Sequence, residues 1–161
     1  MDKIDKIMAN SIFIQCMSEI EQAEKNRIFC RHDFGHSLDV ARICYIMSLE
    51  RNLGFDKEII YATALLHDIG RSAEYRENCS HHQAGARLAE GILKDAGFTD
   101  DEISQICMAI KQHKQPDGNA DNNSLSYLLY KADKLSRRCF DCEAALECYW
   151  SEDTRNKGVD M

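Results

Sequence analysis

Apolar residues recur every three or four positions along most of the chain, which is the spacing of one buried face on an α-helix. The first such pattern covers residues 2–25 and is interrupted at Asn10-Ser11. The second begins after Asp33, a favourable N-cap, and runs toward Asn52 with a stop at Gly54. Proline occurs only once, so the composition allows long uninterrupted helices. The first part of the chain is therefore predicted to be helical.

The most apolar stretch runs from Leu53 to Gly70 and is predicted to be the central helix, with Asp56 as its N-cap. It is apolar nearly all round, which is typical of a helix buried inside a bundle. It ends in ALLHDIGR, so His67 and Asp68 are carried into the interior. Two ionisable groups there are costly unless they are paired or bound to a metal ion. Gly70 is predicted to end the helix in a left-handed conformation.

Further helices are predicted in the second half of the chain, after a polar loop from Ser72 to Cys79. Their N-terminal signals are Ser80 with Gln83, Thr99 with Glu102, and Ser124. The first of these helices is expected to start at His81. Pro116-Asp117-Gly118 predicts a turn, and the polar run to Asn123 predicts a mobile loop that either closes over a site or only connects two helices.

Together these patterns predict an all-α, single-domain helical bundle of six or seven helices. A chain of 161 residues is long enough to bury one core of this kind. We expect the domain to cover residues 1–150, followed by a polar C-terminal tail at residues 151–161.

Charge and targeting signals narrow the classes of function. The net charge of −7 argues against broad binding to nucleic-acid backbones, so an anionic substrate would need metal ions to hold it. We see no basic-then-apolar leader and no segment as long as a membrane span, which favours a cytoplasmic protein that does not enter membranes. The eight cysteines are then expected to be reduced thiols.

Several histidines fall on helix faces that are predicted to point inward. His36, His81 and His113 each lie on an apolar stripe of a different helix, and Gly85 would clear space beside His81. One such histidine alone is more often a hydrogen-bonded core residue. Burying several imidazoles beside carboxylates costs free energy if their polar atoms have no partners, whereas a metal centre would supply a partner to all of them. His32 lies at or before its helix cap and is predicted to support the ligands from behind or to lie on the surface.

One combination of residues resembles a known family. His36, the doublet His67-Asp68 with LL before it and IG after it, and Asp133 in YKADKLSR are similar to the signature of the HD-domain metal-dependent phosphohydrolases. The resemblance covers about residues 32–138. Without the other motif residues, Asp133 would be interpreted as a helix-surface partner of Arg137, one turn on. The resemblance implies an HD-type helical domain in which the four motif residues hold one divalent metal ion.

The resemblance also implies a second ion. His81 begins a His-x-x-x-Gly pattern similar to that of dinuclear family members, and His113 would supply another imidazole. Asp68 would bridge the two ions. His82 lies on the neighbouring helix face and stays open as an alternative to His81. Imidazole and carboxylate ligands suit iron, manganese, zinc or cobalt, and the sequence does not choose among these metals.

The implied reaction is hydrolysis of a phosphoester or phosphoanhydride by a metal-activated water. The substrate would be a small phosphorylated compound, with a nucleotide as the expectation from the family. The candidate catalytic residues are His67, Asp68 and Arg71, which stands where relatives commonly carry a basic residue and would clamp phosphate. An exposed arginine near a helix C-terminus explains Arg71 equally well. The sequence leaves the oligomeric state open, a homo-oligomer included.

Two other classes of function fit parts of the sequence. A non-catalytic HD regulatory module would bind a nucleotide without cleaving it, although such a module has no need of all six metal ligands. Cys139, Cys142 and Cys148, with Cys30 or Cys79 as a fourth ligand, could instead build a zinc or iron–sulfur site with a structural or redox role. Their spacing fits neither signature well, so apolar packing is the default interpretation, with the three thiols near one another.

Overall fold

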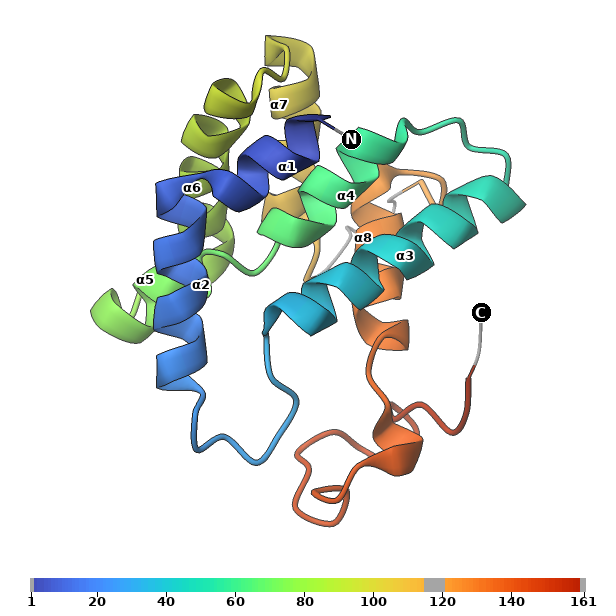
Figure 1. The fold of residues 1–161 in the computed structure, drawn as a ribbon. Coiled ribbons are helices and arrows are strands. Elements are labelled where there is room, and N and C mark those ends of the chain that lie inside the picture. Colours follow the sequence, from blue (N-terminus) through green and yellow to red (C-terminus); the bar gives the residue numbers. More distant parts are fainter. Residues whose placement is uncertain (1, 115–120, 160–161) are drawn as a thin grey trace.

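The computed structural model describes residues 2–114 and 121–159, which contain helices, turns and irregular segments but no β-strand (Figure 1). The helices are α1 (Asp2–Ala9), α2 (Ser11–Ala23), α3 (Phe34–Glu50), α4 (Lys57–Leu66), α5 (Arg71–Glu77), α6 (His81–Ala96), α7 (Asp100–Gln112), α8 (Leu125–Leu135) and a 3-10 helix at Cys139–Asp141. The predicted all-α helical bundle is confirmed. The predicted turn at Pro116-Asp117-Gly118 lies outside the described residues.

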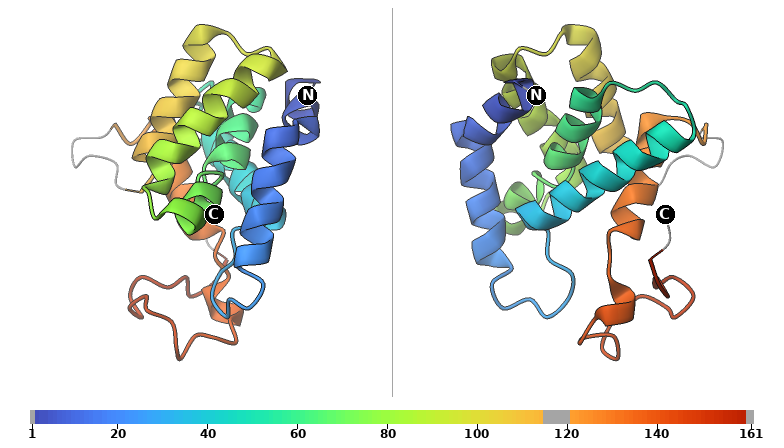
Figure 2. Two further views of the ribbon diagram at one scale, coloured as in Figure 1. Left: turned by 90° about the vertical axis from the view of Figure 1, so that its left-hand side faces the viewer. Right: turned by 45° about the vertical axis from the view of Figure 1, so that its right-hand side comes forward.

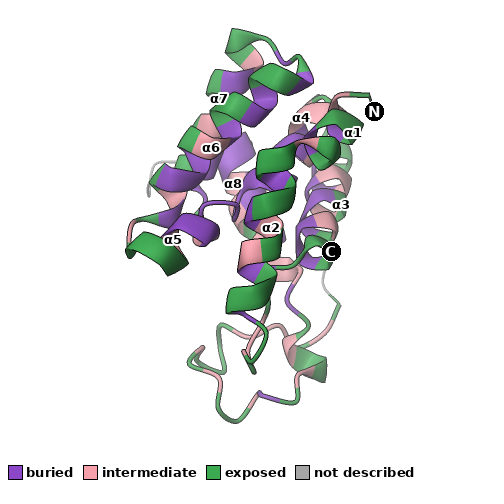
Figure 3. Cartoon of the chain, turned by 60° about the vertical axis from the view of Figure 1, so that its left-hand side comes forward, coloured by how far each residue is buried: buried purple, intermediate pink, exposed green. Residues whose placement is uncertain are grey.

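Helix α4 is the central element, as the sequence predicted, because it packs against α1, α3, α6, α7 and α8. It is shorter than the predicted helix from Leu53 to Gly70, since it begins after the Asp56 cap and ends at Leu66, directly before His67. It belongs to both apolar clusters of the interior. Leu65 and Leu66 pack in the cluster with α1, α2, α6 and α7, whereas Ile60 and Ala64 pack in the cluster with α3 and α8. Figure 3 shows the buried residues on the faces that the helices turn toward one another. Both clusters meet at α4 and fix the position of its C-terminal end.

Most predicted helix starts are confirmed by side-chain caps. The carboxylate of Asp33 accepts a hydrogen bond from the His36 backbone N–H at 2.8 Å, and Thr99 forms the predicted capping box with Glu102. The predicted capping box of Ser80 and Gln83 is wrong, because the Ser80 side chain caps no backbone N–H, although α6 does begin at His81.

Gly70 has a role different from the predicted one. Its φ of −69° and ψ of −10° are right-handed, so it is not a left-handed stop, and α5 occupies most of the predicted polar loop. A Cβ atom on Gly70 would lie 1.9 Å from the His81 carbonyl oxygen and 2.4 Å from the Gly85 nitrogen. Gly70 is therefore required for a close backbone approach to α6. The same contact fills the space beside Gly85, which was predicted to be left for an ion or substrate.

The chain after α8 forms an irregular segment that lies beyond one end of the bundle, near the connection between α2 and α3 (Figures 1 and 2). The rings of Phe29 and Tyr149 meet edge to face with centroids 5.9 Å apart. Asn156 donates hydrogen bonds to the backbone carbonyls of Lys134 and Arg137 at 2.7 and 2.6 Å. These bonds tie the segment to the end of α8, while the domain boundary at residue 150 stays a prediction.

None of the helices in the described part of the chain is long and apolar enough to cross a membrane.

Candidate metal centre

The four residues of the motif meet in the interior from three helices. His36 lies in the first turn of α3, His67 and Asp68 follow α4, and Asp133 lies near the end of α8. His36 Nε2 is 3.2 Å from Asp133 Oδ1 and 3.8 Å from Asp68 Oδ2, and His67 Nε2 is 3.1 Å from Asp68 Oδ2. The ligand atoms of His36, His67 and Asp133 lie within 4.8 Å of one another. The structure thus brings together the residues that the motif predicted.

A second group of imidazoles adjoins the first. His81, His82 and His113 also offer ligand atoms within 4.8 Å of one another, and so do His67, Asp68 and His113. Asp68 lies between the groups, because its Oδ1 is 3.9 Å from His81 Nε2 while its other oxygen faces His67. The centroid of the His82 ring is 3.8 Å from that of His81 and 4.6 Å from that of His113. His81 and His82 could therefore both be ligands of the same ion, because both rings lie beside His113.

Four of these imidazoles share one hydrogen-bond pattern. The Nδ1 atoms of His67 and His113 lie 2.6 Å from the carbonyl oxygens of Ala64 and Ile110, which can only accept. The corresponding partners of His81 and His36 are Glu74 Oε1 at 3.0 Å and Ser136 Oγ at 3.2 Å. With the proton on Nδ1, each ring turns the lone pair of Nε2 toward the shared interior. Metal-binding histidines are held in this way by carbonyl and carboxylate acceptors.

Some of the inward nitrogens have no hydrogen-bond partner. His67 Nε2 and both ring nitrogens of His82 are buried without one in the described part of the chain. For His67 Nε2 the nearby carboxylate oxygen of Asp68 at 3.1 Å is not in hydrogen-bonding geometry. A lone pair facing a carboxylate in a buried site is repulsive unless a cation lies between them. The donor set therefore fits divalent metal ions.

The electrostatic environment of most ligands favours the protonation states that metal binding needs. His67 is the exception, because Asp68 and Asp133 raise its pKa against the effect of burial, so a metal ion on its Nε2 would have to displace a proton. Burial lowers the pKa of His36 to about 4 and that of His113 to about 4, which keeps both rings neutral near pH 7. Burial opposes the charge of Asp133, yet hydrogen bonding to His36 and the nearby positive charges lower its pKa. Asp68 likewise stays ionised against the effect of burial, because His67 and Arg71 lower its pKa. Neutral imidazoles and charged carboxylates are the metal-binding forms of both groups.

Two arginines border the carboxylates. Arg71 Nε donates to Asp68 Oδ1 at 2.9 Å, and its Nη1 donates to Glu74 Oε2 at 3.4 Å. It begins α5 and its side chain is only 20% exposed, so the alternative of an exposed arginine at a helix C-terminus does not describe it. Arg137 Nη2 donates to His36 Nε2 at 3.0 Å and to Asp133 Oδ1 at 3.2 Å. A metal ion on His36 Nε2 would have to replace that hydrogen bond.

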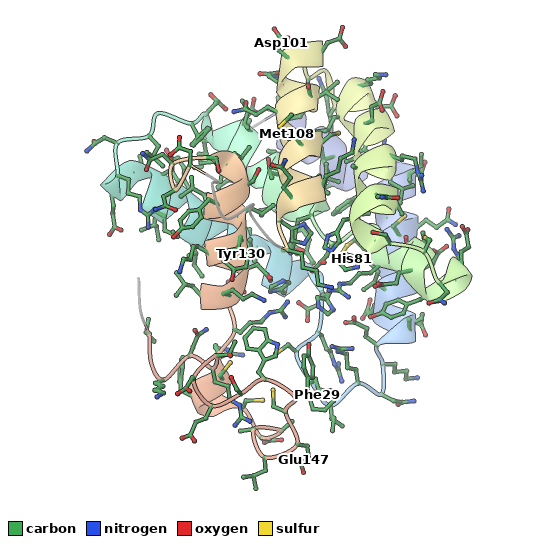
Figure 4. All side chains as sticks on the ribbon, turned by 180° about the vertical axis from the view of Figure 1, so that it is seen from behind. Phe29, His81, Asp101, Met108, Tyr130 and Glu147 are labelled. Atoms are coloured by element: carbon green, nitrogen blue, oxygen red, sulfur yellow. The ribbon has the colours of Figure 1, made fainter. Side chains whose placement is uncertain are left out.

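A cavity of about 350 Å³ opens from these groups toward the C-terminal segment. Its floor includes Asp68, His81, His113 and Asp133. Its walls carry basic residues, aromatic rings and thiols: Arg27, Arg71, Lys114, Lys134, Arg137 and Arg155; Phe29, Tyr149 and Trp150; Cys30, Cys139, Cys142 and Cys148. Figure 4 shows Phe29 beside the C-terminal segment and His81 nearer the centre of the bundle. A chain with net negative charge thus encloses a cavity with a basic wall.

The three C-terminal cysteines were predicted to lie near one another, and the structure places Cys139, Cys142 and Cys148 in the lining of this cavity. All are free thiols of intermediate exposure. Among the described residues, however, no cysteine belongs to a group of three or more side chains whose ligand atoms lie within 4.8 Å of one another. The structure therefore gives no support to a cysteine-bound metal.

Sequence reasoning missed or misplaced three residues of the site. Arg137 was named only as a helix-surface partner of Asp133, one turn away. His32 is 5% exposed and lines the cavity, and it contacts the buried Glu24, which had no place in the prediction. Eight residues and a helix end separate Glu24 from His32, so no periodic pattern could have joined them.

Comparison with known proteins identifies the family. A family model of the HD domain matches residues 33–138. An uncharacterised protein of Clostridium beijerinckii is 38% identical over 156 residues, covering 97% of each chain. Ribonuclease Y of Lawsonia intracellularis is 33% identical over 101 residues, which are 63% of this chain but 17% of the ribonuclease. Bacillus subtilis YueE, whose name assigns it provisionally as a phosphohydrolase, is 29% identical over 118 residues, or 65% of this chain and 66% of YueE.

A solved structure shares the fold. The crystal structure of a predicted HD superfamily hydrolase from an uncultured Thermotogales bacterium matches with a TM-score of 0.62 and 24% identity, covering 88% of this chain and 80% of that chain. The HD family model spans the helices that carry His36, His67, Asp68 and Asp133. This chain therefore belongs to the HD domain family.

Proposed function

We propose that this protein is a metal-dependent phosphohydrolase that cleaves a phosphoester or phosphoanhydride bond in a small substrate. The observation that carries the proposal is the convergence of imidazole Nε2 lone pairs on two buried carboxylates, with the Nδ1 proton of each ring held by a protein acceptor. This arrangement lies at the floor of a cavity with a basic wall, which suits an anionic substrate.

We assign two metal positions. His36, His67, Asp68 and Asp133 would hold the first ion. His81 and His113 would hold the second, with His82 as an additional imidazole beside them. Asp68 has one oxygen toward each group, which supports a bridging role. Bound iron, manganese, zinc or cobalt would supply a water activated as a nucleophile at neutral pH and neutralise phosphoryl oxygens.

The protein's own residues bind and orient the substrate. Arg71 lines the cavity beside Asp68 and presents a guanidinium to an incoming phosphate. Arg137 would be released from His36 Nε2 by metal binding and then offers a second guanidinium at the same cavity. Burial of the carboxylates and imidazoles keeps bulk water from the reacting groups, so the charges act in a medium of low dielectric.

A nucleotide is the substrate class that the cavity fits best. Phe29, Tyr149 and Trp150 line the same cavity as the imidazoles of His81 and His113. Aromatic rings are suited to stacking against a nucleobase while the basic residues bind phosphate. The ribonuclease Y relatives do not extend this proposal to RNA, because the net charge of −7 opposes binding of a long phosphate backbone.

A screen of small phosphorylated compounds with manganese or iron added tests the proposal. We expect phosphate release from nucleotides that depends on the metal and stops when a chelator is added. Binding of a nucleotide without hydrolysis under any metal would instead favour the non-catalytic regulatory module.

A further inference from the structure

A buried carboxylate–histidine pair lies outside the proposed ligand set. Glu24 caps the C-terminal end of α2, and His32 precedes α3. Glu24 Oε1 is 2.5 Å from His32 Nδ1, and Glu24 Oε2 accepts the backbone N–H of His32 at 2.7 Å. The Tyr75 hydroxyl donates to Glu24 Oε1 at 2.5 Å. Glu24 is 3% exposed and His32 is 5% exposed, so the pair is shielded from bulk solvent.

The contacts of Glu24 fix the orientation of the His32 ring. Burial alone opposes ionisation of Glu24, yet the hydrogen bonds from His32 and Tyr75 lower its pKa to about 2. An ionised carboxylate can only accept, so the Nδ1 proton of His32 points at Glu24 and Nε2 is the ring nitrogen left for another partner. A buried ionised glutamate costs free energy, and three donors are used to hold it, which indicates that the orientation of His32 Nε2 has a function.

His32 Nε2 has access to the cavity beside the metal centre. His32 lines the cavity together with Asp68 and Arg71, and its ring meets that of His36 edge to face at 5.9 Å between centroids. His32 Nε2 forms no hydrogen bond with any described residue. It is also not one of the fully buried atoms that lack a hydrogen-bond partner, so it is open to the cavity. His32 also belongs to none of the groups whose atoms are close enough to share a metal ion. It is thus placed to meet a substrate rather than a metal.

We propose that His32 is a catalytic residue that gives the proton of Nε2 to the leaving-group oxygen, and that Glu24 is the residue that positions it. This role rests on the proposed phosphohydrolase function. A bond forms between phosphorus and the oxygen of water, and the bond between phosphorus and the leaving oxygen breaks. The leaving oxygen keeps the electron pair and takes the proton from Nε2. The proton lost by the attacking water returns to His32 through solvent, so one water is consumed for each substrate.

Leaving-group dependence separates proton donation from a structural role. A good leaving group such as p-nitrophenolate departs without a proton, whereas an alkoxide needs one. We would compare metal-loaded wild type with His32→Gln on a series of phosphate esters of increasing leaving-group pKa. His32→Gln should lose about 100-fold or more on alkyl esters and less than about 3-fold on p-nitrophenyl phosphate. Glu24→Gln should change the series in the same direction by a smaller factor.

Glu21→Gln is the matched control, because Glu21 is an exposed glutamate on the same helix and away from the cavity. It should behave as wild type on every ester. Both test variants should keep the helical circular-dichroism spectrum and the metal content of wild type. Equal loss on all esters, or an unchanged series in folded and loaded variants, would overturn the role of His32. If wild type hydrolyses the nucleotides of the screen but no ester of the series, the role of His32 as leaving-group acid fails alone. If it hydrolyses neither under any metal, the phosphohydrolase proposal fails as well.

A second measurement needs no activity. The short hydrogen bond from His32 Nδ1 to Glu24 predicts a low-field proton resonance in the metal-free protein. The resonance should be present in wild type and Glu21→Gln and absent from His32→Gln and Glu24→Gln. Its absence from wild type would overturn the positioning role of Glu24.

Discussion

Arg71 contacts a proposed metal ligand and also lines the proposed substrate cavity. Its guanidinium forms an ion pair with Asp68, and it also lines the cavity where an anionic substrate would lie. The second oxygen of Asp68 faces His67, which lowers the pKa of Asp68 more than Arg71 does. Arg71 can therefore be removed without removing a metal ligand.

We expect Arg71→Ala to leave metal content unchanged and to reduce kcat/KM by about 2–4 kcal/mol of transition-state stabilisation. The physical reason is the loss of a charged, bidentate donor to the transferred phosphoryl group. Arg76→Ala is the control, since Arg76 is on the same helix with a side chain 52% exposed, and it should show wild-type kinetics. Equal kcat/KM for Arg71→Ala and wild type would exclude the phosphate clamp.

The second metal position is tested by three single substitutions. His81→Ala and His113→Ala should each empty only this position and leave a mononuclear protein, because neither ring is among the four residues assigned to the first ion. The ligand atom of His113 lies within 4.8 Å of those of His67 and Asp68, so His113→Ala is the stricter test of that assignment. His82→Ala should weaken the affinity for the second ion while a saturating metal concentration restores it. Metal titration by calorimetry measures all three. A second-site affinity unchanged by His82→Ala would leave His82 as a buried core residue.

The sequence predicted single residues well where a motif names them and poorly where only the fold joins them. His36, His67, Asp68 and Asp133 were named from their order and neighbours, and they do converge. Arg137 was seen as a neighbour of Asp133, but its contact with His36 joins residues 101 positions apart. His32 was placed behind the ligands or on the surface, because its partner Glu24 lies before a chain reversal that no periodicity describes.

At the scale of elements, one backbone contact sets the distance between the two groups of ligands. Gly70 follows the motif and Gly85 lies on α6, and their backbones touch where any side chain on Gly70 would collide with His81 and Gly85. The contact brings the end of α4 against the first turn of α6. Asp68 and His81 are held at opposite sides of this contact.

Gly70→Ala should therefore destabilise the fold by about 3 kcal/mol or more, because the collision is with backbone atoms that have no rotamer to change. Gly91→Ala is the control on α6, where an added Cβ meets nothing within 4 Å and should stabilise by about 0.5–1 kcal/mol. Urea unfolding of the three proteins gives both values. Equal stability of Gly70→Ala and wild type would contradict the close approach.

Element boundaries were predictable where local chemistry decides them. Asp33, Asp56, Thr99 and Ser124 cap helices as expected, because a cap needs only residues next to it in sequence. Helix α5 was taken for a loop, since its seven residues are mostly polar and show no apolar stripe. Its stability comes from packing against α2 and α6, which the local sequence does not display.

For the whole molecule, the buried histidines make stability depend on pH. Burial lowers the pKa of His36 and His113 to about 4 from an ordinary value of 6.5. As pH falls from 6.5 toward 4, these two histidines bind protons in the unfolded chain but stay neutral in the folded chain. Their contribution to the free energy of unfolding is therefore fully present above pH 6.5 and is lost in this window. His67 acts in the opposite direction, because Asp68 and Asp133 raise its pKa against the effect of burial. Its contribution to stability is present below pH 6.5 and is lost as pH rises through the pKa of the folded state.

His36 and His113 should thus each make the metal-free protein about 2 kcal/mol less stable at pH 5 than at pH 7. The lowered pKa values of His81 and His82 add to this difference, and the raised pKa of His67 opposes it. Urea unfolding at the two pH values measures the difference. His113→Leu should reduce the difference between the two pH values by about 2 kcal/mol, because it removes the contribution of that histidine. An identical midpoint at pH 5 and pH 7 would show that these rings are not held neutral by burial.

The central claim is that Asp68 joins two metal ions at the meeting point of the helices, and the metal-to-protein ratio tests it most directly. Wild type loaded with manganese or iron should carry two ions per chain, Asp68→Ala should carry none, and turnover should disappear with them. Asp39→Ala, which removes an exposed carboxylate on α3, should keep both ions. Wild type with no bound metal, or Asp68→Ala with the metal content of wild type, would contradict the account.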